Sequence, residues 1–256
     1  MYICEGEEEI VYWAIGYLGL FLASYWVIMP TLSPTYRTWS TGDKAYWCSS
    51  IISTVNAIYV VKLTIDVGFD EGVDYMVYNL PLMWSSPASL YMGRSLCGYL
   101  LADLMVTLYF NSLCKGYEMI LVHHIAGLYS FLSIMYYRMG HNMMLSSAML
   151  EVTNPVVNAR FMLDKMGYKV THPRLYLLVG ATMTIMYFIV RICFFTAAGV
   201  CTFYRDLELL YSTEAGFRYM VYFGYATGVT LQYVWFNMIL KGLWKLITKK
   251  APQKGA

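Results

Sequence analysis

The segment MILVHHIAGLYSFLSIMYY, Met119–Tyr137, decides the fold of this chain. It is an apolar run long enough to cross a bilayer as a helix, and two adjacent histidines lie inside it. Ionisable side chains are costly in hydrocarbon, so they tend to face the interior of a membrane bundle and to mark function. The segment therefore predicts a membrane helix whose histidines, His123 and His124, are candidate site residues.

The composition of the whole chain agrees with a membrane protein. Of the 256 residues, 59% are hydrophobic and only 13% are charged, whereas soluble domains carry about 25% charged residues. The net charge of +2 is small, and no Lys/Arg cluster is interleaved with aromatic residues in a polar segment. We therefore expect membrane lipids, and no nucleic acid, as partners.

Seven apolar runs, separated by charged or Pro/Gly-rich breaks, predict an all-α polytopic membrane bundle. The predicted spans lie near residues 10–32, 46–66, 94–114, 119–138, 141–159, 174–203 and 217–246. The fifth run is the least apolar, so it could be a full span facing the bundle interior or a re-entrant piece. We expect an N-terminal segment with the first helix (1–40), a membrane domain (41–248) and a basic polar tail (249–256).

The charges between the runs predict one orientation. The acidic N-terminus and loops 67–93 and 204–216 alternate with connections that are rich in Lys and Arg. Because Lys and Arg favour the inner side, we expect the N-terminus outside and the C-terminus inside. The acidic start, MYICEGEEE, does not resemble the basic region of a cleavable signal, so the first helix is expected to stay in the mature protein.

Polar side chains in the fifth run share one helical face. Glu151, Asn154, Pro155 and Asn158 recur at i, i+3, i+4 and i+7 and should face inward. A buried carboxylate needs a partner, and we expect a histidine of the fourth span to pair with Glu151, with Arg191 or Arg160 as the next candidates. The alternative is that the stripe only locks a kinked helix to its neighbours by hydrogen bonds.

Other spans carry isolated polar groups. Asp103 has no basic neighbour in its own helix, so His123, His124, Arg191 or Lys62 should pair with it. Arg191 lies in the middle of the sixth span, which predicts a buried ion pair. Successive helical residues point about 100° apart, so at most one of the two histidines should face a cavity, and we expect no metal site.

The order of these motifs resembles the TLC-domain family of multi-pass membrane proteins, which includes ceramide synthases and TRAM-type proteins. The resemblance covers about residues 40–250 and rests on GYLLAD at 98–103, the two histidines at 123 and 124, and EVTNPVVNAR at 151–160. The Glu-Pro-Asn pattern is most similar to the small non-synthase branch. The resemblance implies a six-helix unit, here preceded by one further helix, in the endoplasmic reticulum.

Two departures from the synthases affect the functional hypothesis. Asn56 precedes Ala57 where the family often has a histidine, and the stretch 146–151 lacks the synthases' second His-Asp and further Asp. We therefore expect a protein that binds lipid or acyl chains, in lipid homeostasis or as an accessory membrane subunit, without robust catalysis and without a cofactor. The expected polar cavity consists of Asn56, Glu151, Asn154, Asn158 and Arg191.

Two alternatives stay open. The first is a ceramide-synthase-like acyltransferase with acyl-CoA as substrate, in which His123 or His124 is the base and Asp103 or Glu151 orients it. The second is a structural subunit of a large membrane complex, for example in the mitochondrial inner membrane, with partner chains covering loop 67–93 and the tail.

Overall fold

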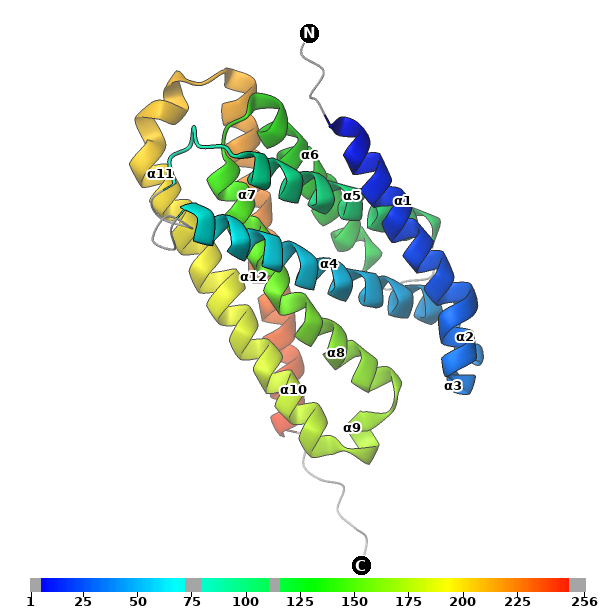
Figure 1. Cartoon of the computed structure of the whole chain (residues 1–256). Coiled ribbons are helices and arrows are strands. Elements are labelled where there is room, and N and C mark those ends of the chain that lie inside the picture. Colours follow the sequence, from blue (N-terminus) through cyan, green and yellow to red (C-terminus); the bar gives the residue numbers. More distant parts are fainter. Residues whose placement is uncertain (1–5, 72–79, 111–115, 249–256) are drawn as a thin grey trace, which may run out of the picture.

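The computed structural model describes residues 6–71, 80–110 and 116–248, and every regular element in this part of the chain is helical (Figure 1). The all-α prediction is confirmed. In chain order the elements are α1 (Glu7–Ala23), η1 (Ser24–Ile28), α2 (Met29–Leu32), α3 (Pro34–Arg37), α4 (Thr41–Glu71), α5 (Pro87–Tyr109), α6 (Tyr117–Tyr137), α7 (His141–Ala148), η4 (Met149–Thr153), α8 (Asn154–Lys165), α9 (Tyr168–Thr171), α10 (Pro173–Met186), η5 (Tyr187–Phe194), α11 (Phe195–Ser212) and α12 (Ala215–Thr248).

Several elements join end to end, so the described residues form seven long helical segments. These cover 7–32, 41–71, 87–109, 117–137, 141–165, 173–212 and 215–248, and each overlaps one predicted run. Four segments are long and apolar enough to cross a membrane by length and composition: Glu7–Leu32, Thr41–Asp70, Tyr117–Tyr137 and Pro173–Ser212. The chain is thus a helical membrane protein, while spanning by the other three segments stays a prediction. Residues 111–114 of the predicted third span, part of loop 67–93 and the tail lie outside the described residues.

The fifth segment is helical throughout residues 141–165, but its helix tightens to a 3₁₀ turn at Met149–Thr153. The cause is Pro155, which has no N–H to donate to the carbonyl of Glu151 four residues earlier. The backbone N–H of Asn154 bonds to that carbonyl instead. From this turn, the carboxylate of Glu151 reaches Asn56 on α4.

Two segments contain π-helical stretches, η1 in the first and η5 in the sixth. A π-helical stretch turns the side chains that follow it relative to an α-helix and is frequent at functional sites. The longer stretch, η5, carries the buried Arg191. The direction of this guanidinium therefore depends on a helical distortion that the apolar pattern does not reveal.

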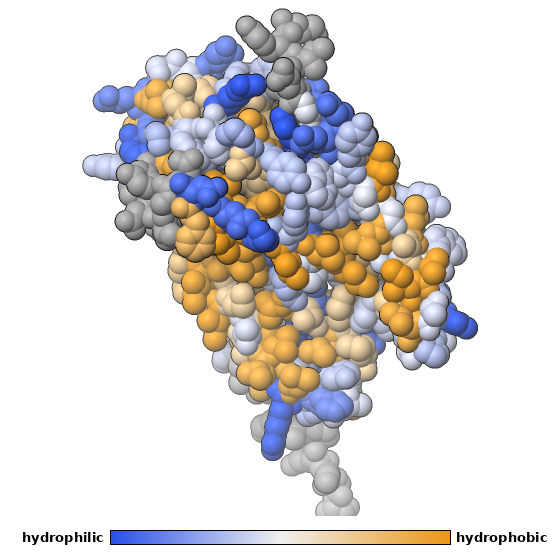
Figure 2. Space-filling model, in the orientation of Figure 1, coloured by the Kyte–Doolittle hydropathy of each residue, from blue (hydrophilic) through white to orange (hydrophobic). Residues whose placement is uncertain are grey.

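The segments pack as a bundle in which α1 lies along α5, α4 lies between α5 and α8, and α6 lies between α5 and α12. Contact between α1 and α5 needs Gly98, because a Cβ there would lie 2.3 Å from the Cβ of Trp13. Figure 2 shows apolar residues over the middle and lower part of one face, with hydrophilic residues gathered above. The start of α1 and the end of α12 lie at opposite ends of the molecule (Figure 1).

Candidate functional site

A cavity of about 110 Å³ lies between α5, α6, the α7–η4 segment, the η5–α11 segment and α12. Each segment contributes one helical face. The residues of α12 on the cavity wall are Met220, Val221, Gly224, Tyr225, Thr227, Gly228, Leu231 and Gln232. Since a helix rises 1.5 Å per residue, this wall extends for ~18 Å. The cavity is therefore narrow and elongated.

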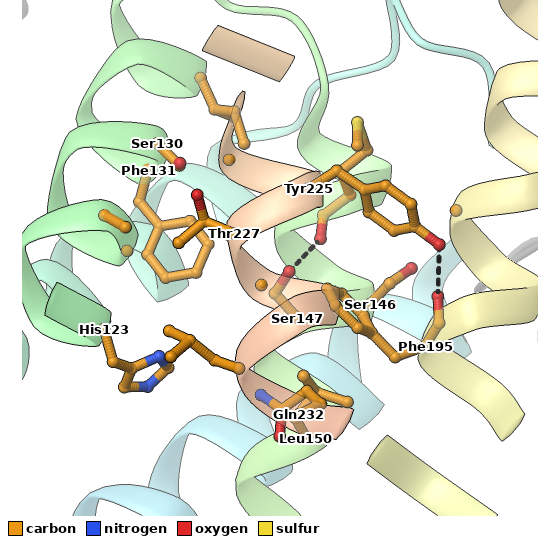
Figure 3. A pocket seen from close by; sticks show the side chains of 18 of the residues that line it. His123, Ser130, Phe131, Ser146, Ser147, Leu150, Phe195, Tyr225, Thr227 and Gln232 are labelled. Atoms are coloured by element: carbon orange, nitrogen blue, oxygen red, sulfur yellow. Dashed lines mark hydrogen bonds between the residues drawn. The ribbon is translucent and has the colours of Figure 1, made fainter. Parts of the chain in front are cut away.

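The two ends of the cavity differ in chemistry. Apolar side chains such as Ile134, Met220 and Val221 line one end, and Glu151, Arg191, Gln232 and His123 line the other. Figure 3 shows His123 and Gln232 at the same end of this pocket, with Phe131 and Phe195 farther along it. Ser147 lies on the wall between these ends, and its hydroxyl donates to the carbonyl of Met143 at 2.9 Å within its own helix. The arrangement suits a molecule with a long apolar part and one polar group.

Arg191 is the centre of the polar end and is 7% exposed. Its Nε donates to Thr153 Oγ1 (2.6 Å), Nη1 to Gln232 Oε1 (3.2 Å), and Nη2 to Asn154 Oδ1 (2.6 Å) and to the carbonyl of Leu150 (3.2 Å). The guanidinium thus connects η4, α8 and α12. The prediction of a direct ion pair for Arg191 is wrong, because these acceptors are neutral oxygens and no carboxylate of the described residues lies within ion-pair distance.

Glu151 is held by two asparagines. Its Oε2 accepts from Asn154 Nδ2 at 2.7 Å and from Asn56 Nδ2 at 3.4 Å. The predicted histidine partner is therefore wrong in this structure, and Arg191 acts on Glu151 through Asn154. The carboxylate is partly exposed although it lies within the bundle, because it lines the cavity.

The expected inward stripe of the fifth segment is present. Asn158 Nδ2 donates to the Ser50 carbonyl and to Thr54 Oγ1, both at 3.0 Å, and Asn154 also reaches Ser53 Oγ at 3.4 Å. These contacts tie α8 to α4. Asn158 lies away from the cavity wall, so the structure gives it a packing contact rather than a place in the cavity.

Asn56 and Asn154, also expected in the cavity, do not line it but hold Glu151, which does. We call Asn56, Glu151, Asn154, Arg191 and Gln232 the cavity cluster. Sequence reasoning missed Gln232, and it also missed Thr153 and Tyr17, whose hydroxyl donates to Asn56 Oδ1 at 3.1 Å. A usable signal for Gln232 was present in the sequence. Gly224, Gly228 and Gln232 recur every four residues, so two small residues and one amide share a face of an otherwise apolar helix.

A second polar group, the closed cluster, consists of Ser49, Asp103 and His124. Ser49 Oγ donates to one Asp103 oxygen at 2.5 Å, and His124 Nε2 lies 3.5 Å from the other. His124 was one of the partners expected for Asp103. Asp103 and His124 are buried, and neither lines the cavity.

The two histidines therefore point to different surroundings, as expected for neighbours on a helix. His123 faces the cavity, and its ring packs edge-on against Trp235 with centroids 5.3 Å apart. His124 faces Asp103. Among the described residues no group of three or more His, Cys, Asp and Glu side chains is arranged to hold a metal ion.

The fold and this cavity define a class: a multi-helix membrane protein whose bundle contains an elongated, mainly apolar cavity with a polar end. Residues 46–241 match the family model of the TLC domain, and the chain belongs to this family. The resemblance drawn from the motifs at 98–103, 123–124 and 151–160 is thereby confirmed.

Curated relatives extend the match beyond the domain. The chain is 27% identical to TLC domain-containing protein 4-A of Xenopus laevis over 248 residues, which covers 94% of this chain and 92% of the relative. It is also 27% identical to TLC domain-containing protein 4 of Xenopus tropicalis, over 87% of this chain and 84% of the relative. These relatives represent a non-synthase branch, as the Glu-Pro-Asn pattern predicted.

Proposed function

We propose that this protein binds a lipid or a single acyl chain in the cavity and acts in lipid homeostasis or as an accessory membrane subunit. The observation that carries the proposal is the cavity itself, with a mainly apolar wall ~18 Å long on α12 and a cluster of hydrogen-bonding groups at one end. An amphiphile would place its chain along α12 and its headgroup at Glu151 and Gln232. A bundle that binds no ligand would require neither this cavity nor polar groups without protein partners at its end.

Lipidomics of the purified protein tests this proposal. Gly127 lines the cavity, and a Cβ there would meet only Leu100 Cδ1, at 3.4 Å. Gly127→Leu therefore adds bulk to the cavity with little strain elsewhere. The matched control is Gly16→Leu, because Gly16 lies on the exposed face of α1 and a Cβ there meets nothing within 4 Å.

Wild type and Gly16→Leu should co-purify with the same lipid, and Gly127→Leu should lose most of it. Equal lipid content in all three proteins, measured per mole of folded protein, would contradict binding in this cavity.

Acyl transfer from acyl-CoA is the second candidate. The observation in its favour is His123, an imidazole at the polar end of the cavity. Against it, the carboxylate of Asp103 contacts His124, which is off the cavity, and neither Glu151 nor any other carboxylate of the described residues lies within ion-pair distance of His123. An acyl-CoA turnover assay on wild type, His123→Ala and His124→Ala decides the matter, and equal rates in all three would dismiss it.

For localisation we propose the endoplasmic reticulum membrane, on the strength of family membership, with the N-terminus outside and the C-terminus in the cytosol. The alternative is a structural subunit of a mitochondrial inner-membrane complex. Protease protection of epitope tags at both ends, in fractionated organelles, separates these cases. A stable lipid-loaded monomer in detergent would count against the subunit hypothesis.

A further inference from the structure

At the polar end of the cavity, Glu151 and Gln232 each have one hydrogen-bonding atom to spare, and the imidazole of His123 lines the same end. Glu151 Oε2 accepts from both asparagines, while its Oε1 has no partner among the described residues. Gln232 Oε1 accepts from Tyr187 OH (2.7 Å) and Arg191, while its Nε2 has no partner there either. Neither spare atom is fully enclosed, and both residues line the cavity. Glu151 and Gln232 therefore offer the cavity one acceptor and one donor.

The orientation of the amides follows from Arg191. A guanidinium can only donate, so the Gln232 atom that faces it must be the oxygen, and the amide nitrogen must point away from it. The same argument turns the oxygen of Asn154 to Arg191 and its nitrogen to Glu151. The donor at Gln232 is thus a consequence of the network and not an arbitrary choice of amide rotamer.

The charges of the cavity cluster balance. Arg191 contributes one positive charge and Glu151 one negative charge, and Asn154 hydrogen-bonds to both. An added carboxylate or phosphate headgroup would lie next to the Glu151 carboxylate. An ammonium headgroup could donate to Glu151 but would leave Gln232 Nε2 facing another donor. A net charge in this interior is costly.

We propose that the cavity selects a single-chain lipid with an uncharged headgroup that both donates and accepts a hydrogen bond, such as a long-chain alcohol or a primary amide. This inference rests on the proposed lipid-binding function. The headgroup donates to Glu151 Oε1 and accepts from Gln232 Nε2, and its chain runs along α12 toward Met220.

Native mass spectrometry of delipidated protein tests the inference with four probes that share one C18 chain: oleyl alcohol, oleamide, oleate and oleylamine. The alcohol and the amide should bind about tenfold more tightly than the two charged probes near neutral pH, because each charged probe leaves one cavity atom unpaired or opposed. Equal binding of all four would overturn the headgroup inference and leave chain binding intact. Binding of none would overturn the proposed function as well.

The variant Glu151→Gln sharpens the test. The neutral amide no longer repels the carboxylate of oleate and can donate a hydrogen bond to it. The affinity for oleate should therefore rise about tenfold relative to that for oleyl alcohol. Glu118→Gln, on the exposed first turn of α6, is the matched control and should keep the wild-type ranking. An unchanged ranking in Glu151→Gln would contradict the role of this carboxylate, and the wild-type ranking alone still tests the proposal if the variant is unstable.

Discussion

The cavity cluster and the closed cluster are built from similar residues, but they differ in whether both oxygens of the carboxylate have protein partners. Each contains one carboxylate inside a helical bundle, and each carboxylate is held by side chains from neighbouring helices. In the closed cluster both Asp103 oxygens have protein partners. In the cavity cluster the second oxygen of Glu151 has none among the described residues and is accessible from the cavity. Spare hydrogen-bonding capacity next to a cavity, and not a buried charge by itself, distinguishes a binding site from a packing contact.

The largest effect should come from removing the hub of the cavity cluster. Arg191→Leu deletes four hydrogen bonds and leaves Glu151 without its buried counter-charge, so the free energy of unfolding should fall by roughly 3–5 kcal/mol. Thermal unfolding in detergent measures this. Arg174→Leu, on the exposed start of α10, should change stability by less than about 0.5 kcal/mol. Similar losses in both variants would show that the cluster does not stabilise the bundle.

Glu151 variants should separate stability from ligand binding. Glu151→Leu leaves the amide donor of Asn56 unpaired and that of Asn154 with only its long contact to Ser53 Oγ, and it should cost about 1–3 kcal/mol. Glu151→Gln keeps most of these hydrogen bonds and should stay close to wild type. A thermal-shift series with and without oleyl alcohol compares the two. If Glu151→Leu were as stable as wild type, the carboxylate would not lie in the network described.

The closed cluster should affect stability but not binding. Asp103→Asn keeps an acceptor for Ser49 and weakens the contact with His124, so a loss of about 0.5–1.5 kcal/mol is expected. The amount of co-purified lipid should equal that of wild type. A loss of lipid in Asp103→Asn, at unchanged fold, would join the two clusters into one functional unit.

The smallest effect is expected where α4 and α8 meet at their polar ends. Lys165 pairs with Asp43, and each side chain is about one-third exposed. Solvent screens such a pair, so Lys165→Ala should cost no more than about 1 kcal/mol. Lipid content and probe ranking should not change. A larger loss, seen by the same thermal unfolding, would mean that the α4–α8 contact depends on this pair rather than on the asparagine contacts of Asn154 and Asn158.

The helices could be predicted from the sequence because each apolar run and each polar break is visible within a short stretch of residues. The structure extends several of them: the run at 46–66 belongs to the helix Thr41–Glu71, since polar residues at its ends still form helical hydrogen bonds. The inward face of the fifth segment followed from its spacing. The pairing of Asp103 with His124, rather than with Arg191 or Lys62, could not be predicted, because it depends on which helices are neighbours.

The cavity and the true partners of Glu151 could not be predicted for a physical reason. A gap between helices depends on side-chain volumes from five segments at once, and no single run reveals it. Arg191 looked like an ion-pair partner, yet the π-helical stretch η5 turns it toward Thr153 and Gln232. Glu151 looked like a histidine partner, yet the 3₁₀ turn before Pro155 and the neighbouring α4 place asparagines there.

A density map of the protein in lipid nanodiscs, with a bound antibody fragment to increase its size, tests the central claim most directly. The account predicts tubular density along the cavity face of α12, from Gln232 toward Met220, that ends in a headgroup between Glu151 and Gln232. A cavity that is empty, or filled by rearranged side chains of α6 and α12, would contradict it.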